Sequence, residues 1–76
     1  MRKFILEYAD LQDDRKRILQ VLAENGIEAI DFTSGRDLYQ HIIIRVKSTK
    51  ELRWIMDKLN QVCEYGVKVV KKGELR

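Results

Sequence analysis

The chain has 76 residues, of which 45% are hydrophobic and 36% charged. This length suits one small domain, and the apolar content excludes a disordered chain. The longest apolar runs, such as residues 42–44, fall far short of the roughly 20 residues that a membrane-spanning helix needs. The net charge of +3 mixes 15 basic with 12 acidic residues, so charge alone does not indicate a nucleic-acid partner.

The first apolar stretch, residues 3–8, predicts a strand with one buried face. Phe4, Leu6 and Tyr8 alternate with a second row that contains Ile5. We therefore expect the first three in the core and Ile5 on the opposite face of a sheet.

Residues 11–25 follow a helical pattern, with Asp10 as the expected N-cap. Asp13 and Asp14 would lie near the positive end of the helix dipole, and Asn25 with Gly26 would end the helix. The predicted apolar stripe is Leu11, Ile18, Val21 and Leu22.

Two further strands are predicted, over residues 27–33 and 38–47, with a turn at 34–37 between them. So short a connection predicts an antiparallel hairpin. The expected buried row of the second strand is Ile42, Ile44 and Val46. The opposite row is Tyr39, His41, Ile43 and Arg45.

Ser48 and Glu51 match a capping box, which predicts the start of a second helix. Tyr65 and Gly66 would end this segment, and a fourth strand is predicted over residues 67–71, followed by a loose tail at 72–76. The apolar face of the helix is Leu52, Ile55, Met56, Leu59, Val62 and Cys63.

The predicted order is strand, helix, strand, strand, helix, strand. Right-handed crossovers then give a four-stranded antiparallel sheet with both helices on one face. The first and third strands are central in this arrangement. The fold is therefore predicted as α+β, a ferredoxin-like βαββαβ sandwich formed by a single domain. The other sheet face is expected to be open, and it carries Ile5, Tyr39, His41, Ile43 and Arg45.

Few residues offer catalytic or metal-binding chemistry. His41 is the only histidine, and in mid-strand we interpret it as a half-exposed sheet residue. The single cysteine, Cys63, excludes an internal disulfide, and on an apolar stripe it is expected to be buried and inert. The helix dipole accounts for Asp10, Asp13 and Asp14 better than a metal site does. The sequence therefore predicts neither an enzyme nor a cofactor.

RNA-recognition motifs share the predicted topology, so an RNA-binding domain is an alternative. Such domains stack bases on aromatic residues of the two central strands. Here the third strand offers Tyr39, whereas Glu7 would place a carboxylate on the same platform, which disfavours nucleic acid. Arg15, Lys16 and Arg17 are interpreted as a solvated helix face, with Asp13 and Arg17 paired at i,i+4.

Residues 7–10 and 18–27, the latter reading ILQVLAENGI, resemble the first half of an ACT domain. Residues 55–62, continued through Gly66 and Val67, resemble the second half. The resemblance extends from Phe4 to Lys71 and is nearest to the C-terminal ACT domain of alarmone synthetase/hydrolases. It implies a non-catalytic regulatory or protein-interaction module, in which a small ligand bound at a dimer interface would signal to an attached parent enzyme.

In the ACT family the loop after the first strand commonly reads Asp-Arg-Pro-Gly and contacts the ligand. Aligned without gaps, the corresponding residues here are Asp10, Leu11, Gln12 and Asp13, and they are the predicted ligand-binding residues. Because Asp13 stands where the family has glycine, free amino acids are expected to bind weakly or not at all.

The predicted interface consists of Trp54 and the open sheet face with Ile5, Tyr39, His41 and Ile43. Trp54 falls roughly 140° from the centre of the apolar stripe, where it would either meet a partner or lie over Lys50 and Lys58. The expected partner is a second copy or a parent protein. A designed scaffold without natural function is a further alternative, because proline is absent. The lack of a leader pattern predicts a cytoplasmic protein without membrane association.

Overall fold

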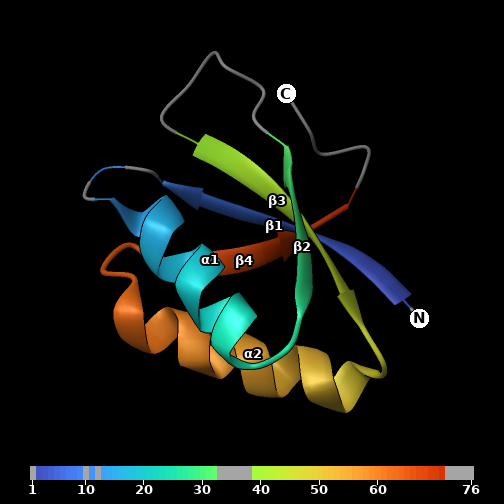
Figure 1. Cartoon of the computed structure of the whole chain (residues 1–76). Helices are drawn as coiled ribbons and strands as arrows, with labels where there is room; N and C mark the ends of the chain where they lie inside the picture. Colours follow the sequence, from blue (N-terminus) through green and yellow to red (C-terminus); the bar gives the residue numbers. More distant parts are fainter. Residues whose placement is uncertain (1, 10, 12, 33–38, 72–76) are drawn as a thin grey trace.

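The computed structural model in Figure 1 describes residues 2–9, 11, 13–32 and 39–71. Four strands and two helices follow one another in the order βαββαβ. Their bounds are β1 (Arg2–Ala9), α1 (Asp14–Glu24), β2 (Glu28–Phe32), β3 (Tyr39–Val46), α2 (Thr49–Val62) and β4 (Val67–Val70). The strands therefore lie inside the predicted ranges, apart from Arg2 and Ala9 at the ends of β1. The predicted turn at 34–37 and tail at 72–76 fall outside the described residues.

The strands form one antiparallel sheet in the order β2-β3-β1-β4. The central strands are β1 and β3, and both helices cover the same sheet face (Figure 1). In the β1–β3 register Phe4 pairs with Ile44 and Leu6 with Ile42. This confirms the ferredoxin-like fold and the predicted strand phase.

The core lies between the sheet and the helices, where period-2 and period-3.6 apolar rows meet. Phe4 and Met56, which the sequence pattern also predicts in the core, are partly buried and pack against it. The buried core residues are Leu6, Tyr8, Ile18, Leu22, Ile27, Ile42, Ile44, Val46, Leu52, Ile55, Leu59, Cys63 and Val67.

The first helix begins later than predicted. Its N-cap is Asp13, in the left-handed region at φ 59°, and its side chain makes no capping hydrogen bond. Leu11 therefore precedes the helix and is exposed rather than part of the apolar stripe. Asp14 is the buried acidic residue, and its Oδ1 accepts from Arg17 Nη1 at 2.9 Å. Arg17 thus pairs at i,i+3, whereas we predicted a pair with Asp13.

The end of α1 is where the sequence predicts it. Gly26, at φ 69°, donates its N–H to Ala23 O, and Ile27 N–H donates to Leu22 O. These two bonds cap the last carbonyls in the Schellman pattern. Glycine suits this position because an L side chain is disfavoured at positive φ.

The second helix also begins as predicted. Ser48 Oγ accepts from Glu51 N–H at 3.2 Å, and Glu51 Oε1 accepts from Lys47 N–H at 2.9 Å. The helix ends at Val62 with Cys63 as C-cap. Val62 is exposed, although we predicted it on the apolar face. No helix in the described part of the chain is long and apolar enough to cross a membrane.

The sheet face opposite the helices is only partly open. His41 and Val70 on this face are buried, and Ile5 and Ile43 are half-buried. The predicted half-exposed state of His41 is therefore wrong. The reason is its central position, because β3 places it between Glu7 of β1 and Phe32 of β2 in register. Ile30 and Tyr39 are exposed on the same face.

Candidate functional site

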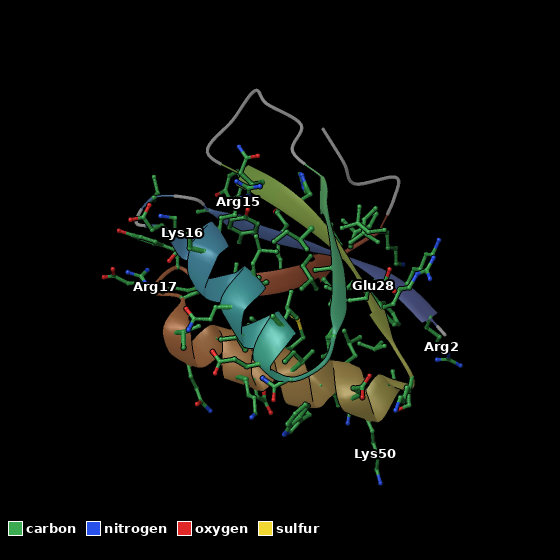
Figure 2. All side chains as sticks on the ribbon, in the orientation of Figure 1. Arg2, Arg15, Lys16, Arg17, Glu28 and Lys50 are labelled. Carbon is green, nitrogen blue, oxygen red and sulfur yellow. The ribbon has the colours of Figure 1, made fainter. Side chains whose placement is uncertain are left out.

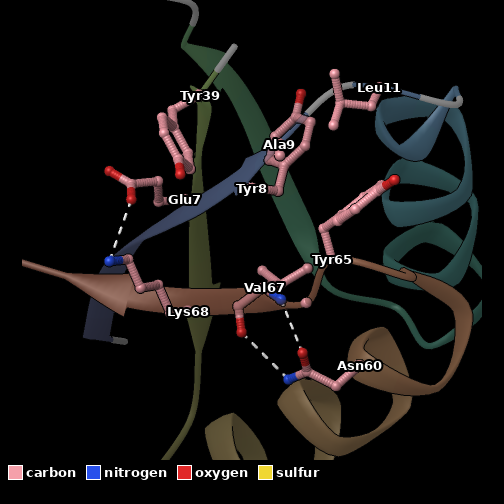
Figure 3. A pocket seen from close by; sticks show the side chains of 10 residues that line it. Glu7, Tyr8, Ala9, Leu11, Tyr39, Asn60, Tyr65, Val67 and Lys68 are labelled. Carbon is pink, nitrogen blue, oxygen red and sulfur yellow. Dashed lines mark hydrogen bonds and ion pairs between the residues drawn. The ribbon is translucent and has the colours of Figure 1, made fainter.

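An open pocket lies at the end of the sheet where β1 finishes and β3 and β4 begin (Figure 3). The C-terminal end of α2 and the following turn form its other side. Its volume is about 430 Å³, which is within the range of small-molecule sites. The lining residues are Glu7, Tyr8, Ala9, Leu11, Tyr39, Asn60, Tyr65, Gly66, Val67 and Lys68.

Asn60 fixes the side of the pocket formed by α2 and β4. Its Oδ1 accepts from Val67 N–H at 2.7 Å, and its Nδ2 donates to Val67 O at 3.2 Å and to Met56 O at 2.9 Å. Gly66 turns the chain here at φ 78°, and a Cβ at this position would lie 3.1 Å from Asn60 Oδ1. A glycine and a fully engaged amide therefore hold this wall in place.

The opposite wall carries two polar residues, Glu7 of β1 and Lys68 of β4, and Glu7 also contacts His41 of β3. Glu7 pairs in register with His41 of β3 and with Lys68 of β4. Glu7 Oε2 lies 3.1 Å from His41 Nε2, and Glu7 Oε1 lies 3.4 Å from Lys68 Nζ. The exposed fractions of these side chains are 16% for Glu7, 3% for His41 and 69% for Lys68. The accessible charge of this wall is thus the lysine ammonium.

Aromatic and apolar side chains border the opening. The rings of Tyr39 and Tyr65 lie on its two sides with Tyr8 between them (Figure 3). Tyr39 and Tyr65 are exposed, Leu11 at the rim is exposed as well, and Tyr8 is buried. The pocket therefore presents two accessible ring faces beside one mobile cation.

The predicted ligand loop coincides with the pocket at one described residue. Leu11 lines the pocket. Asp13 is exposed and is not among the lining residues. Asp10 and Gln12 lie outside the described residues. The positive φ of Asp13 is the conformation that glycine adopts most readily, and glycine is what the resemblance places there.

The predicted interface residues lie on two separate surfaces. Trp54 on α2 is exposed, and Lys58 Nζ lies 4.4 Å from its ring centroid. Lys58 Nζ also donates to Asn25 Oδ1 at 3.2 Å. The local cation–π interpretation therefore holds for Lys58. Tyr39 is the exposed member of the sheet-face set, since Ile5 and Ile43 are half-buried and His41 is buried.

Cys63 is buried in the core, as predicted. Burial raises the pKa of its thiol from 9.0 to about 11, and the Asp14 carboxylate adds to this rise while Arg17 opposes it. Because the thiolate is the nucleophilic form, Cys63 is unreactive near neutral pH.

The basic triplet of α1 points into solvent. Arg15, Lys16 and Arg17 are exposed near the start of the helix (Figure 2), and Arg17 is held by Asp14. Among the described residues, no group of three or more His, Cys, Asp or Glu side chains is placed to hold a metal ion. Asp10, one of the three acidic residues considered with Asp13 and Asp14, lies outside the residues that the structure describes.

Sequence reasoning missed the pocket itself, and with it Asn60, Tyr65 and Lys68. The alternation of residues 67–71 alone does not show that Lys68 lies beside Glu7. That contact follows only from the register of β1 with β4. The Asn60 clamp depends on a turn whose geometry no sequence pattern specifies. Comparison with protein-family models, with curated proteins and with solved structures finds no match.

Proposed function

We propose that this domain is a non-catalytic regulatory module that binds a small ligand in the pocket at the end of β1. The observation that carries the proposal is the combination of an open pocket of about 430 Å³ with two exposed tyrosine rings and an accessible lysine. Concave sites with a few polar groups among apolar ones are the usual form of ligand sites. The resemblance to ACT domains, which are regulatory, agrees with this role.

The chemistry of the described side chains supports binding rather than catalysis. Cys63 is buried with a raised thiol pKa, and a general base must reach the proton that it abstracts. His41 is buried behind Glu7 and is not among the pocket-lining residues. Neither residue is placed to act on a molecule held between Tyr39 and Tyr65.

A thermal-shift screen tests the binding function. A compound that binds only the folded state should raise the Tm by about 5 °C or more at ten times its Kd. The same compound should leave the Tm of an Ala9→Phe variant unchanged, because Ala9 lines the pocket beside Tyr39. A compound that shifts both proteins equally binds elsewhere, and a screen of nucleotides, organic acids and amines without any shift contradicts the proposal.

Free amino acids are expected to give no shift. This expectation rests on the alignment with the ACT ligand loop, in which Asp13 places a carboxylate where the family has glycine, and not on the lining of the pocket, which does not include Asp13. Isothermal titration calorimetry with the standard amino acids provides the check. Micromolar binding of any of them to the unmodified chain would show that Asp13 does not block this class of ligand.

We further propose that the domain works as a homodimer. Ile30 and Tyr39 on the sheet face and Trp54 on α2 are exposed large hydrophobic residues, and aromatic side chains of this kind are enriched in interface hot spots. Sedimentation from micromolar to millimolar concentration should reveal the dimer. Trp54 is the only tryptophan, so a blue shift of its emission over this range would assign the contact to α2. Monomer throughout contradicts self-association.

A further inference from the structure

We infer that the pocket selects ligands in which a planar aromatic ring carries an anionic group. This inference rests on the proposed binding function and adds the chemical class of the ligand. It follows from which polar groups of the lining are already engaged within the protein and which stay accessible.

The amide of Asn60, on the α2 side of the pocket, has no N–H group left for a ligand. Asn60 uses its carbonyl oxygen on Val67 N–H and its amide nitrogen on Val67 O and Met56 O. An amide nitrogen has two N–H groups, so both are engaged. The same bonds occupy both polar backbone groups of Val67. Asn60 therefore offers a ligand no further donor, whereas an aromatic ring needs only contact with the exposed ring of Tyr65.

Apolar and aromatic surface dominates what remains accessible. Tyr39 is 54% exposed, Tyr65 is 56% exposed and Leu11 is 46% exposed. Figure 3 shows the ring of Tyr8 between the rings of Tyr39 and Tyr65, with Val67 below them. Aromatic rings attract other planar π systems in offset or edge-to-face arrangements. The lining thus favours a flat ring over a flexible aliphatic chain.

The charged side chains that line the pocket determine whether a positively or a negatively charged ligand is favoured. Glu7 is 16% exposed, and each of its oxygens already faces a partner, His41 Nε2 or Lys68 Nζ. Lys68 is 69% exposed, and an ammonium has three N–H groups, so it can donate to Glu7 and to a ligand together. An organic cation would have to compete with Lys68 for Glu7 and would be repelled by it. An anion meets the exposed ammonium directly.

Four naphthalene derivatives with one ring system and different charges test the inference. They are 2-naphthoate, 2-naphthyl phosphate, the neutral 2-naphthamide and the cation 2-naphthylmethylammonium. Titration followed by amide chemical shifts gives both the Kd and the site. We expect the two anions to bind more tightly than the amide by about 1.4-fold to fivefold, the range of an exposed ion pair. The cation should bind most weakly. The tighter of the two anions indicates a carboxylate or a phosphate as the natural group.

The shifted amides should be those of Ala9, Gly66 and Lys68, which line the pocket. Those of Trp54 and Ile30, which are not pocket-lining residues, should not respond. Lys68→Met should remove the preference for the anions, while Lys50→Met, at a lysine near the start of α2 (Figure 2), should keep it. Tyr65→Leu should weaken all four ligands by about tenfold, the usual size of a lost aromatic stacking contact.

Four results would overturn the inference. Tightest binding by the cation would mean that Glu7 rather than Lys68 recognises the charge. Equal binding of the anions and the amide, or an unchanged preference in Lys68→Met, would remove the anionic requirement. If none of the four compounds binds, the pocket does not select for an aromatic ring. In that last case the proposed function still stands on its own test, if the thermal-shift screen finds a compound whose effect is lost in Ala9→Phe.

Discussion

At the residue scale, the backbone conformation of Asp13 can be compared with the residue type that the ACT resemblance places at this position. Its φ of 59° and ψ of 28° are left-handed helical values, which cost most L residues roughly 1–2 kcal/mol and cost Asp and Asn less. The gapless alignment with the ACT ligand loop, made from sequence, puts glycine at this position. The backbone thus keeps the conformation that glycine favours while the side chain differs.

We expect Asp13→Gly to change the free energy of unfolding by less than about 1 kcal/mol. Relief of the left-handed strain and the greater chain entropy of glycine in the unfolded state oppose each other, and no side-chain cap bond is lost. Asp13→Val should destabilise by more than 1 kcal/mol, because a β-branched residue is poorly tolerated at positive φ. Urea denaturation of the three proteins measures both. A strongly destabilised glycine variant would mean that the carboxylate contributes to stability.

Cys63 should make the free energy of unfolding fall as the pH rises in the alkaline range. Its folded pKa of about 11 exceeds the ordinary 9.0, so the protonated thiol favours the folded state. This contribution is complete below pH 9 and is lost as the pH rises from 9 to 11. The difference in unfolding free energy between the protein and Cys63→Ala should therefore shrink across that window. A constant difference from pH 8 to pH 11 would contradict the raised pKa. Tyrosine and lysine titrations affect both proteins and cancel in the difference.

At the element scale, the two helix starts show where sequence patterns suffice and where they fail. Ser48 and Glu51 form a cap from residues three apart, so a local pattern specifies it. For α1 the sequence indicates Asp10 as the N-cap, whereas the N-cap in the structure is Asp13. Leu11 was then placed on the helix stripe by periodicity alone, although it lies before the helix and lines the pocket.

The cap of α2 can be tested by one substitution. Ser48→Ala removes the acceptor for Glu51 N–H and should destabilise the protein by about 1 kcal/mol. For a domain of this size, that corresponds to a fall in Tm of about 4–8 °C. Thr49→Ala, one position into the helix, is the matched control and should change the Tm much less. Equal effects of the two variants would show that the cap bond is not what stabilises the first turn.

At the scale of the whole molecule, the sequence predicts the layers well and the pocket poorly. Alternation in β1 and β3 and the helical stripes each select one face, and their agreement is enough to define the sheet, the helices and most of the core. The pocket depends on long-range register, which joins Glu7 to Lys68 across β1 and β4 and to His41 across β1 and β3. Burial of His41 has a similar origin, because β1, which lies beside β3 in the sheet, is distant from it in sequence.

The two sheet faces should respond differently to the same charge. Ile44 is fully buried between the sheet and the helices, whereas Ile30 on the opposite face of the adjacent strand is 45% exposed. Ile44→Asp buries an unpaired carboxylate, which costs several kcal/mol and should unfold so small a domain, whose total stability is of the order of 5–15 kcal/mol at most. Ile30→Asp leaves its carboxylate in water and should keep the fold. Far-ultraviolet circular dichroism and thermal melts of the two variants compare the faces directly.

If Ile44→Asp melts within a few degrees of the unmodified protein, Ile44 is not enclosed and the strand phase is wrong. If Ile30→Asp unfolds instead, the face opposite the helices is covered within the monomer and is not available to a second copy.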